Sequence, residues 1–192
     1  MTAKTHDLAA VTALLVLVLA NAPDSLRLST LLLAVFANQL GGVAPDIDQP
    51  TAPLWRNLPE GHFFGKIFHR LAGGHRFLSH SIIGFALFAW LSNLVLHFLH
   101  PIMPRVDIQV VWYAFLIGYA SHLVMDSFTK EGVPWLLPVP FKFGVPPLKS
   151  LRVTTGHAVE NFMVLPALIV FDIWLCASHY TQLVALLHHV AR

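Results

Sequence analysis

Five segments of this chain are apolar over about the length that a helix needs to cross a bilayer. A transmembrane helix uses about 20 predominantly apolar residues to span the hydrocarbon core. The segments lie near residues 7–23, 26–44, 80–99, 108–127 and 160–179. They predict an all-α fold, a polytopic membrane helical bundle of about five transmembrane helices. We expect residues 1–192 to form a single membrane-embedded domain.

The composition favours lipid as the solvent of this chain. Of its 192 residues, 56% are hydrophobic and only 11% are charged, whereas a soluble domain carries about a quarter charged residues. The net charge of +2 is too small to indicate a nucleic-acid partner. Cys176 is the single cysteine, which excludes a thiolate metal cluster. Asp172 lies deep in the last segment and is expected to be protonated or paired locally.

The basic residues predict the orientation of the bundle. Connections on the cytoplasmic side of a membrane protein carry an excess of Lys and Arg. Three basic residues fall on one side of the predicted bundle, namely Arg27, Arg105 and Arg192. Nine fall on the other side, namely Lys4, Arg56, Lys66, Arg70, Arg76, Lys130, Lys142, Lys149 and Arg152. We therefore expect a multi-pass protein with a cytoplasmic N-terminus.

The two long connections lie on that basic side. In residues 45–79, the spacing of Phe63, Phe64, Ile67, Phe68 and Leu71 forms one apolar helical stripe, which favours a helix lying at the membrane surface. Residues 129–159 contain five prolines among large apolar side chains, so a regular helix is excluded there. We expect this segment to form a proline-rich, partly inserted cap. The alternative is that both connections merely rest on lipid.

Histidines and carboxylates flank the apolar segments in a pattern that places them on one face. His6 precedes the first segment, and Asp46 and Asp48 follow the second. The remaining residues are His75 and His80 before the third segment, His122 and Asp126 at the end of the fourth, and Glu160 at the start of the fifth. Because the chain changes sides with each crossing, all of these residues reach the same face of the membrane. They predict a metal site at the inner leaflet.

The local spacing suits metal coordination. His122 and Asp126 are four residues apart and share one helical face. Asp46 and Asp48 are two apart, so they point alike on an extended exit from the second helix. Mixed imidazole and carboxylate ligands favour zinc, with manganese or iron as alternatives. Ordinary helix-terminal charge is the alternative for the aspartates, and a structural hydrogen-bonded pair is the alternative for His122 and Asp126.

The number of candidate ligands is larger than one tetrahedral zinc site needs, so one or two divalent ions are expected. Glu160 is predicted to act as a ligand or as a general base. Four residues are predicted to hold an anionic substrate or assist the reaction, namely Arg76, Lys149, Arg152 and the hydroxyl of Ser79.

Several short motifs resemble one known family. They are Lys4-Thr5-His6, Gly42-Val43-Ala44-Pro45-Asp46-Ile47-Asp48, His75-Arg76 with Ser79-His80-Ser81, and Gly118-Tyr119-Ala120-Ser121-His122 with Asp126, followed by Thr129, Gly132-Val133 and Leu136-Leu137-Pro138. In this order they resemble the YdjM-like family of inner-membrane-associated metal-dependent hydrolases, also labelled LexA-binding or LexA-regulated. Phe77 and Ser79 stand where that family has glycine and threonine. The resemblance implies a prokaryotic inner-membrane protein with hydrolase activity.

The leading hypothesis is a membrane-bound metal-dependent hydrolase that acts on an ester or phosphoester, with membrane lipid as environment and substrate, at the cytoplasmic leaflet. A metal-ion or proton transporter is the first alternative, because charged residues inside membranes often mark ion paths. A non-catalytic membrane protein stabilised by metal is the second.

Overall fold

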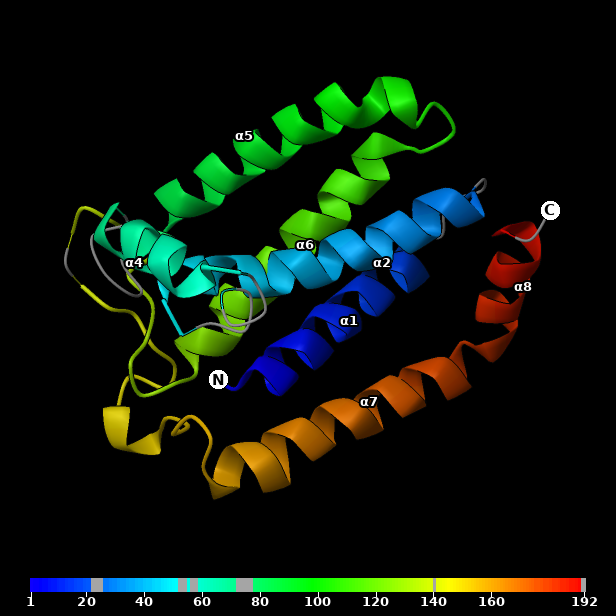
Figure 1. Ribbon diagram of the computed structural model, residues 1–192. Coiled ribbons are helices and arrows are strands. Elements are labelled where there is room, and N and C mark those ends of the chain that lie inside the picture. The colour runs from blue at the N-terminus through cyan, green and yellow to red at the C-terminus, as the bar shows by residue number, and fades with distance from the viewer. Residues whose placement is uncertain (22–25, 52–54, 56–58, 72–77, 140, 191–192) are drawn as a thin grey trace.

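The structure is a computed structural model that describes residues 1–192 except 22–25, 52–54, 56–58, 72–77, 140 and 191–192, and it leaves the side chains of residues 62, 64, 68, 71 and 189 undescribed (Figure 1). Five described helices are long and apolar enough to cross a membrane. They are α1 (Ala3–Ala20), α2 (Leu28–Val43), α5 (Ile82–Leu99), α6 (Ile108–Ser127) and α7 (Leu165–Ser178). A 3₁₀ turn, Ala44–Asp48, extends α2, and a π-helical turn, Glu160–Val164, leads into α7. The prediction of an all-helical bundle with five candidate spans is confirmed.

Two helix starts differ from the predicted ones in a way that matters for the site. Helix α1 begins at Ala3 because the carbonyl of Thr2 accepts hydrogen bonds from the amides of Thr5 and His6. His6 therefore lies inside the first helix, one turn from its start. Helix α5 begins later than expected, because Ser81 is its N-cap and accepts from the amide of Gly84 at 3.0 Å. His80 therefore precedes the cap.

Helices α2 and α6 form the centre of the bundle and pack at backbone contact. A Cβ on Gly41 would lie 2.1 Å from the carbonyl oxygen of Phe115, and one on Gly118 would lie 2.0 Å from that of Asn38. Small residues at such interfaces let membrane helices approach closely. Asn38 is buried and donates to the carbonyl of Ala114 at 3.1 Å. Asn38, which lowers the hydropathy of α2, therefore forms a hydrogen bond between α2 and α6.

The other spans surround this pair. Helix α5 packs on α6 through Phe85 and Phe88, which contact the ring of Tyr119. Helix α7 packs along α1. Thr12 of α1 donates to Asp172 of α7 at 3.0 Å, which confirms a local partner for that carboxylate. Helix α8 (Tyr180–Val190) turns away after His179, and Gln182 donates to the carbonyl of Leu19.

The starts of α1, α5 and α7 and the ends of α2 and α6 lie together at one end of the bundle, which we call the ligand-bearing end (Figure 1). Helix α4 (Gly61–Leu71) lies at this end and exposes Phe63 and Ile67. The helix agrees with the prediction, although the side chains of Phe64, Phe68 and Leu71 lie outside the described ones.

The proline-rich segment 129–159 also covers the ligand-bearing end. It is irregular apart from single β-bridges, Thr129 with Val153 and Val133 with Phe143, and a short 3₁₀ turn. Val133 is fully buried against Tyr119 and Leu123, and the carbonyl of Trp135 accepts from the amide of Ile82. The segment is therefore anchored to α5 and α6 as a folded cap.

Candidate metal site

Five side chains from four parts of the chain converge at the ligand-bearing end. They are His6 from α1, Asp46 from the turn after α2, His80 from the residues before α5, and His122 and Asp126 from α6. Four of them are at most 2% exposed, whereas the side chain of Asp46 keeps 26% exposure. The open side of this cluster is therefore at Asp46.

The spacing of the ligand atoms is that of groups around a shared cation. Nε2 of His80 lies 3.8 Å from Asp46 Oδ1 and 3.5 Å from Asp126 Oδ2. Nε2 of His122 lies 3.7 Å from each of the same two oxygens. These separations are longer than a hydrogen bond. Zinc–nitrogen and zinc–oxygen bonds of about 2.0–2.2 Å would place tetrahedral ligand atoms about 3.3–3.6 Å apart. The four nitrogen–oxygen separations are close to that range. The ligand atoms form two overlapping groups, His6 with His122 and Asp126, and Asp46 with His80 and His122, each with its atoms within 4.8 Å of one another.

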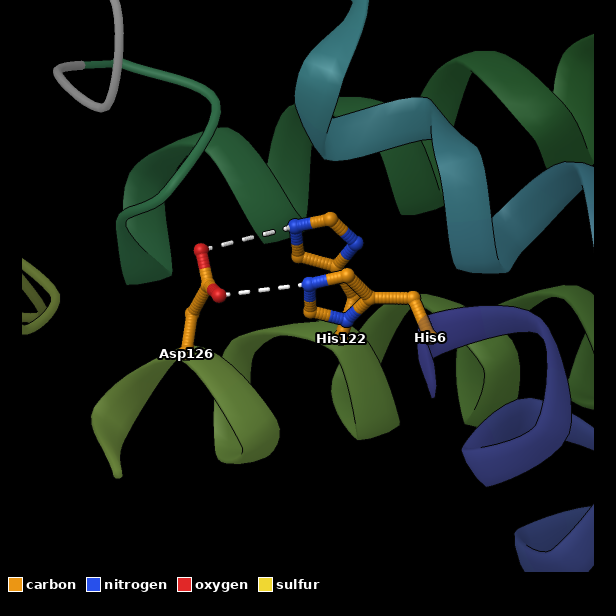
Figure 2. A group of neighbouring side chains, drawn as sticks. All are labelled: His6, His122 and Asp126. Atoms are coloured by element: carbon orange, nitrogen blue, oxygen red, sulfur yellow. Dashed lines mark ion pairs between the residues drawn. The ribbon is translucent and has the colours of Figure 1, made fainter. Parts of the chain in front are cut away.

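Asp126 presents its two oxygens to different partners. Oδ2 faces His80 and His122, whereas Oδ1 lies 3.2 Å from Nε2 of His6. Figure 2 shows the His6 and His122 rings lying one above the other, with one nitrogen of each facing a different oxygen of Asp126. The rings are stacked with centroids 3.7 Å apart. A carboxylate in this arrangement is suited to bridge two positions.

A positive group already occupies the second position. The α-amino group of Met1 lies 2.5 Å from Asp126 Oδ1 and 3.0 Å from Nε2 of His6. The charge of the amino group offsets that of the buried carboxylate, which would be costly alone. The cluster therefore favours a cation on chemical grounds.

The Nδ1 atoms of His122 and His80 form hydrogen bonds outside the cluster, and these bonds orient Nε2 of each ring toward the cluster. Nδ1 of His122 donates to the carbonyl of Gly42 at 2.7 Å, which leaves the Nε2 lone pair facing the cluster. That Nε2 is buried and has no hydrogen-bond partner among the described residues. Metal-binding histidines almost always donate their other ring nitrogen in this way. The carbonyl of Gly42 is a partner of His122 that the sequence alone did not reveal.

His80 is oriented through a serine. Ser79 Oγ lies 3.0 Å from Nδ1 of His80 and donates to Asp48 Oδ2 at 2.6 Å. Because that hydroxyl hydrogen goes to Asp48, Nδ1 of His80 acts as donor to Ser79 and Nε2 carries the lone pair. Tyr119 is fully buried and donates to the carbonyl of Ser79 at 2.5 Å, which fixes this loop. Asp48 and Ser79 therefore hold the ring of His80 through Nδ1, on the side away from the cluster.

We expect Ser79→Ala to weaken metal binding about 10-fold to 100-fold, because the residues behind the ligands typically contribute that much. Titration of the metal-free protein with zinc measures the affinity. Ser92→Ala is the matched control, since Ser92 lies on α5 and donates to the carbonyl of Ala89, away from the cluster. Equal zinc affinity in Ser79→Ala and the control would contradict a supporting role for Ser79.

Glu160 belongs to neither group of candidate ligands, which are His6 with His122 and Asp126, and Asp46 with His80 and His122. Its Oε1 accepts from the amide and hydroxyl of Thr2 and from the hydroxyl of Thr5, and its Oε2 accepts from the amide of Gly156. The carboxylate is fully buried. It joins the start of α7 to the start of α1 and so helps to position Met1 and His6. The sequence alone did not indicate that Thr2 and Thr5 donate hydrogen bonds to Glu160.

The remaining predicted residues are placed as follows. Arg152 donates to the carbonyls of Pro146 and Pro147 within the cap, and Lys149 is exposed on the turn Lys149–Leu151. His75 and Arg76, predicted as a ligand and a catalytic residue, lie outside the described residues.

Comparison with known proteins identifies relatives of this chain. The family model described as YdjM inner membrane protein matches residues 1–189. The inner membrane protein YdjM of Escherichia coli (strain K12) is 33% identical over 132 residues, which cover 68% of this chain and 60% of the relative. The Shigella flexneri protein of that name gives the same values. Protein YvsG of Bacillus subtilis (strain 168) is 24% identical over 125 residues, which cover 65% of this chain and 67% of the relative.

No solved structure matches the chain significantly. The chain spans about 60% of the length of the YdjM relatives it matches. The YdjM relatives are named as inner membrane proteins, and together with the five apolar helices they support a multi-pass inner-membrane location. The match over nearly the whole chain confirms the resemblance noted in the sequence, and this chain belongs to the YdjM inner membrane protein family.

Proposed function

We propose that this chain is a metal-dependent hydrolase of the inner membrane that cleaves an ester or phosphoester bond at the cytoplasmic leaflet. The observation that carries the proposal is the convergence of Asp46, His80, His122 and Asp126, whose four nitrogen–oxygen separations are 3.5–3.8 Å. Mixed nitrogen and oxygen ligands favour zinc, with manganese or iron as alternatives. The excess of basic residues at the ligand-bearing end supports a cytoplasmic orientation.

The cluster has room for one or two ions. The four residues would supply the ligands of a first ion. Oδ1 of Asp126 and Nε2 of His6 would supply two ligands of a second ion if the amino group of Met1, which contacts both atoms, moved away. A bound divalent ion lowers the pKa of water to about 7 and polarises a phosphoryl or acyl oxygen. Asp48 and Ser79 hold His80 in place, and the carbonyl of Gly42 holds His122. The partly exposed Asp46 marks the side from which water reaches the cluster.

The proposal is tested with the full chain purified in detergent and analysed for elements. We expect at least about one equivalent of divalent metal per chain, since the four ligands form a complete set. Chelation should abolish hydrolysis of a phosphomonoester, phosphodiester or carboxylic ester in a substrate screen, and zinc should restore it. Metal-free protein after purification with zinc would contradict the site.

The alternatives give different results in the same preparation. A transporter needs access to its ligands from both sides and places them near the midplane, whereas these ligands lie at one end of the bundle. Metal flux into proteoliposomes that depends on Asp46 would favour transport. Loss of helical structure on chelation, with no substrate turned over, would favour a purely structural metal.

A further inference from the structure

An apolar groove leads from the candidate metal site into the membrane core. Two cavities of about 410 and 370 Å³ lie beside α6, the first against α7 and the second between α1 and α6 with one residue of α7, and both are lined by Met125 and Leu168. The first reaches Phe128 and Val153 at the ligand-bearing end, and the second reaches Ile117. Helix α7 packs mainly along α1, which leaves its α6-facing side open. Because they share two lining residues, the cavities are neighbours along α6, and we call the two together the groove.

The depth of the groove matches one leaflet. Nine residues of α6 separate Asp126 from Ile117, which corresponds to about 13 Å at 1.5 Å per residue. The hydrocarbon core is about 30 Å thick, so one leaflet contributes about 15 Å. The groove therefore extends from the level of the cluster to about the midplane.

The groove presents an apolar surface, and the polar side chains that line it already have hydrogen-bond partners. Its lining is apolar except for Thr12 and Ser121. Thr12 is bonded to the carbonyl of Leu8 and to Asp172, and Ser121 donates to the carbonyl of Gly118. An apolar chain can fill this space without leaving a buried polar group unsatisfied.

Met1 connects the groove to the cluster. Its side chain lines the first cavity, and its amino group contacts Asp126 and His6. Met125 lines both cavities and directly precedes Asp126 in α6. A chain lying in the groove would thus bring its polar end beside Met1, whose amino group contacts Asp126 Oδ1.

We propose that this groove binds one acyl chain of a membrane glycerolipid and presents the ester or phosphoester of its head group to the cluster. This inference rests on the proposed function, which it extends to a substrate class. The two cavities fall in the range of small-molecule sites, about 300–1,000 Å³. The apolar lining and the length of about one leaflet fit an acyl chain, so a lipid chain is the occupant rather than a second copy of the protein.

The test is photocrosslinking in nanodiscs of phosphatidylethanolamine and phosphatidylglycerol that contain phosphatidic acid with a diazirine midway along one acyl chain. We expect label on peptides of α6 and α7 that line the groove. Ala167→Trp should reduce this labelling at least about tenfold, because an indole takes the space of the chain beside Leu168. Ala177→Trp is the matched control on the same helix, since Ala177 is exposed and outside the groove.

Labelling unaffected by Ala167→Trp, or confined to residues outside the groove, would overturn the inference. Crosslinks between two chains through Ala167→Cys would also overturn it, because a second copy would then fill the groove. Labelling needs no turnover, so groove labelling in a protein without hydrolase activity would support the lipid site while contradicting the proposed function. If the protein is active, Ala167→Trp should slow cleavage of the long-chain lipid and spare a short, soluble ester.

Discussion

Replacing His122 and Asp126 together with alanine is expected to lower metal affinity by more than about 100-fold, the upper value for losing a residue behind the ligands. The two residues contribute Nε2 and Oδ2 to the four-ligand set from one face of α6. Their removal also takes away both oxygens that face His6 and His80. Elemental analysis of the purified variant measures the loss, and hydrolysis of any substrate found for the wild type should fall to background.

The control for this result is His97→Ala, because His97 is exposed on α5 and its ring contacts the carbonyl of Asn93. Asp126→Asn is a second variant that keeps the shape of the side chain, so that a loss of metal is not confused with a loss of folding. Wild-type metal content in the folded double variant would count directly against the cluster as the metal site.

Gly118→Leu is expected to lower the free energy of unfolding by about 3 kcal/mol or more, at the upper end of overpacking effects. A Cβ at this position would lie 2.0 Å from the carbonyl oxygen of Asn38 and 2.9 Å from the amide nitrogen of Gly42. Both atoms belong to backbone, so α2 and α6 would have to separate. Thermal unfolding followed by size-exclusion chromatography measures the effect.

The same substitution should reduce metal binding, because the carbonyl of Gly42 holds the ring of His122. Ala86→Leu is the matched control, since Ala86 is exposed on α5 and adds a side chain of the same size. If Gly118→Leu melted at the same temperature as Ala86→Leu, the close approach of α2 and α6 would not be a determinant of this fold.

The sequence determined the number of spans and the face on which the ligands gather. Both follow from local properties: apolar length sets a membrane helix, and each crossing reverses the side. His122 and Asp126 also came from a local rule, the four-residue repeat of a helix. Their place in the cluster with Asp46 and His80 followed from the pattern of flanking residues.

Other roles depended on distances that no local rule contains. Asp48 and Ser79 lie behind His80, where the loop before α5 places them, and Glu160 binds Thr2 and Thr5 instead of joining either ligand group. Those positions depend on how each helix is rotated about its axis and how its end is capped. The hydropathy of a segment does not depend on how its helix is rotated about its axis. The spacing of residues in the sequence therefore could not identify these partners.

What the sequence alone established, therefore, is a five-span membrane chain with histidine and aspartate side chains at one end. Only the tertiary structure decided which of those side chains share a cation-sized space, because this depends on α2 and α6 meeting at Gly41 and Gly118. The groove beside the cluster likewise exists because α7 packs on α1 and stands away from α6. Contacts between distant segments set both features, and the physical reason is that helix separation is governed by the side chains at each crossing.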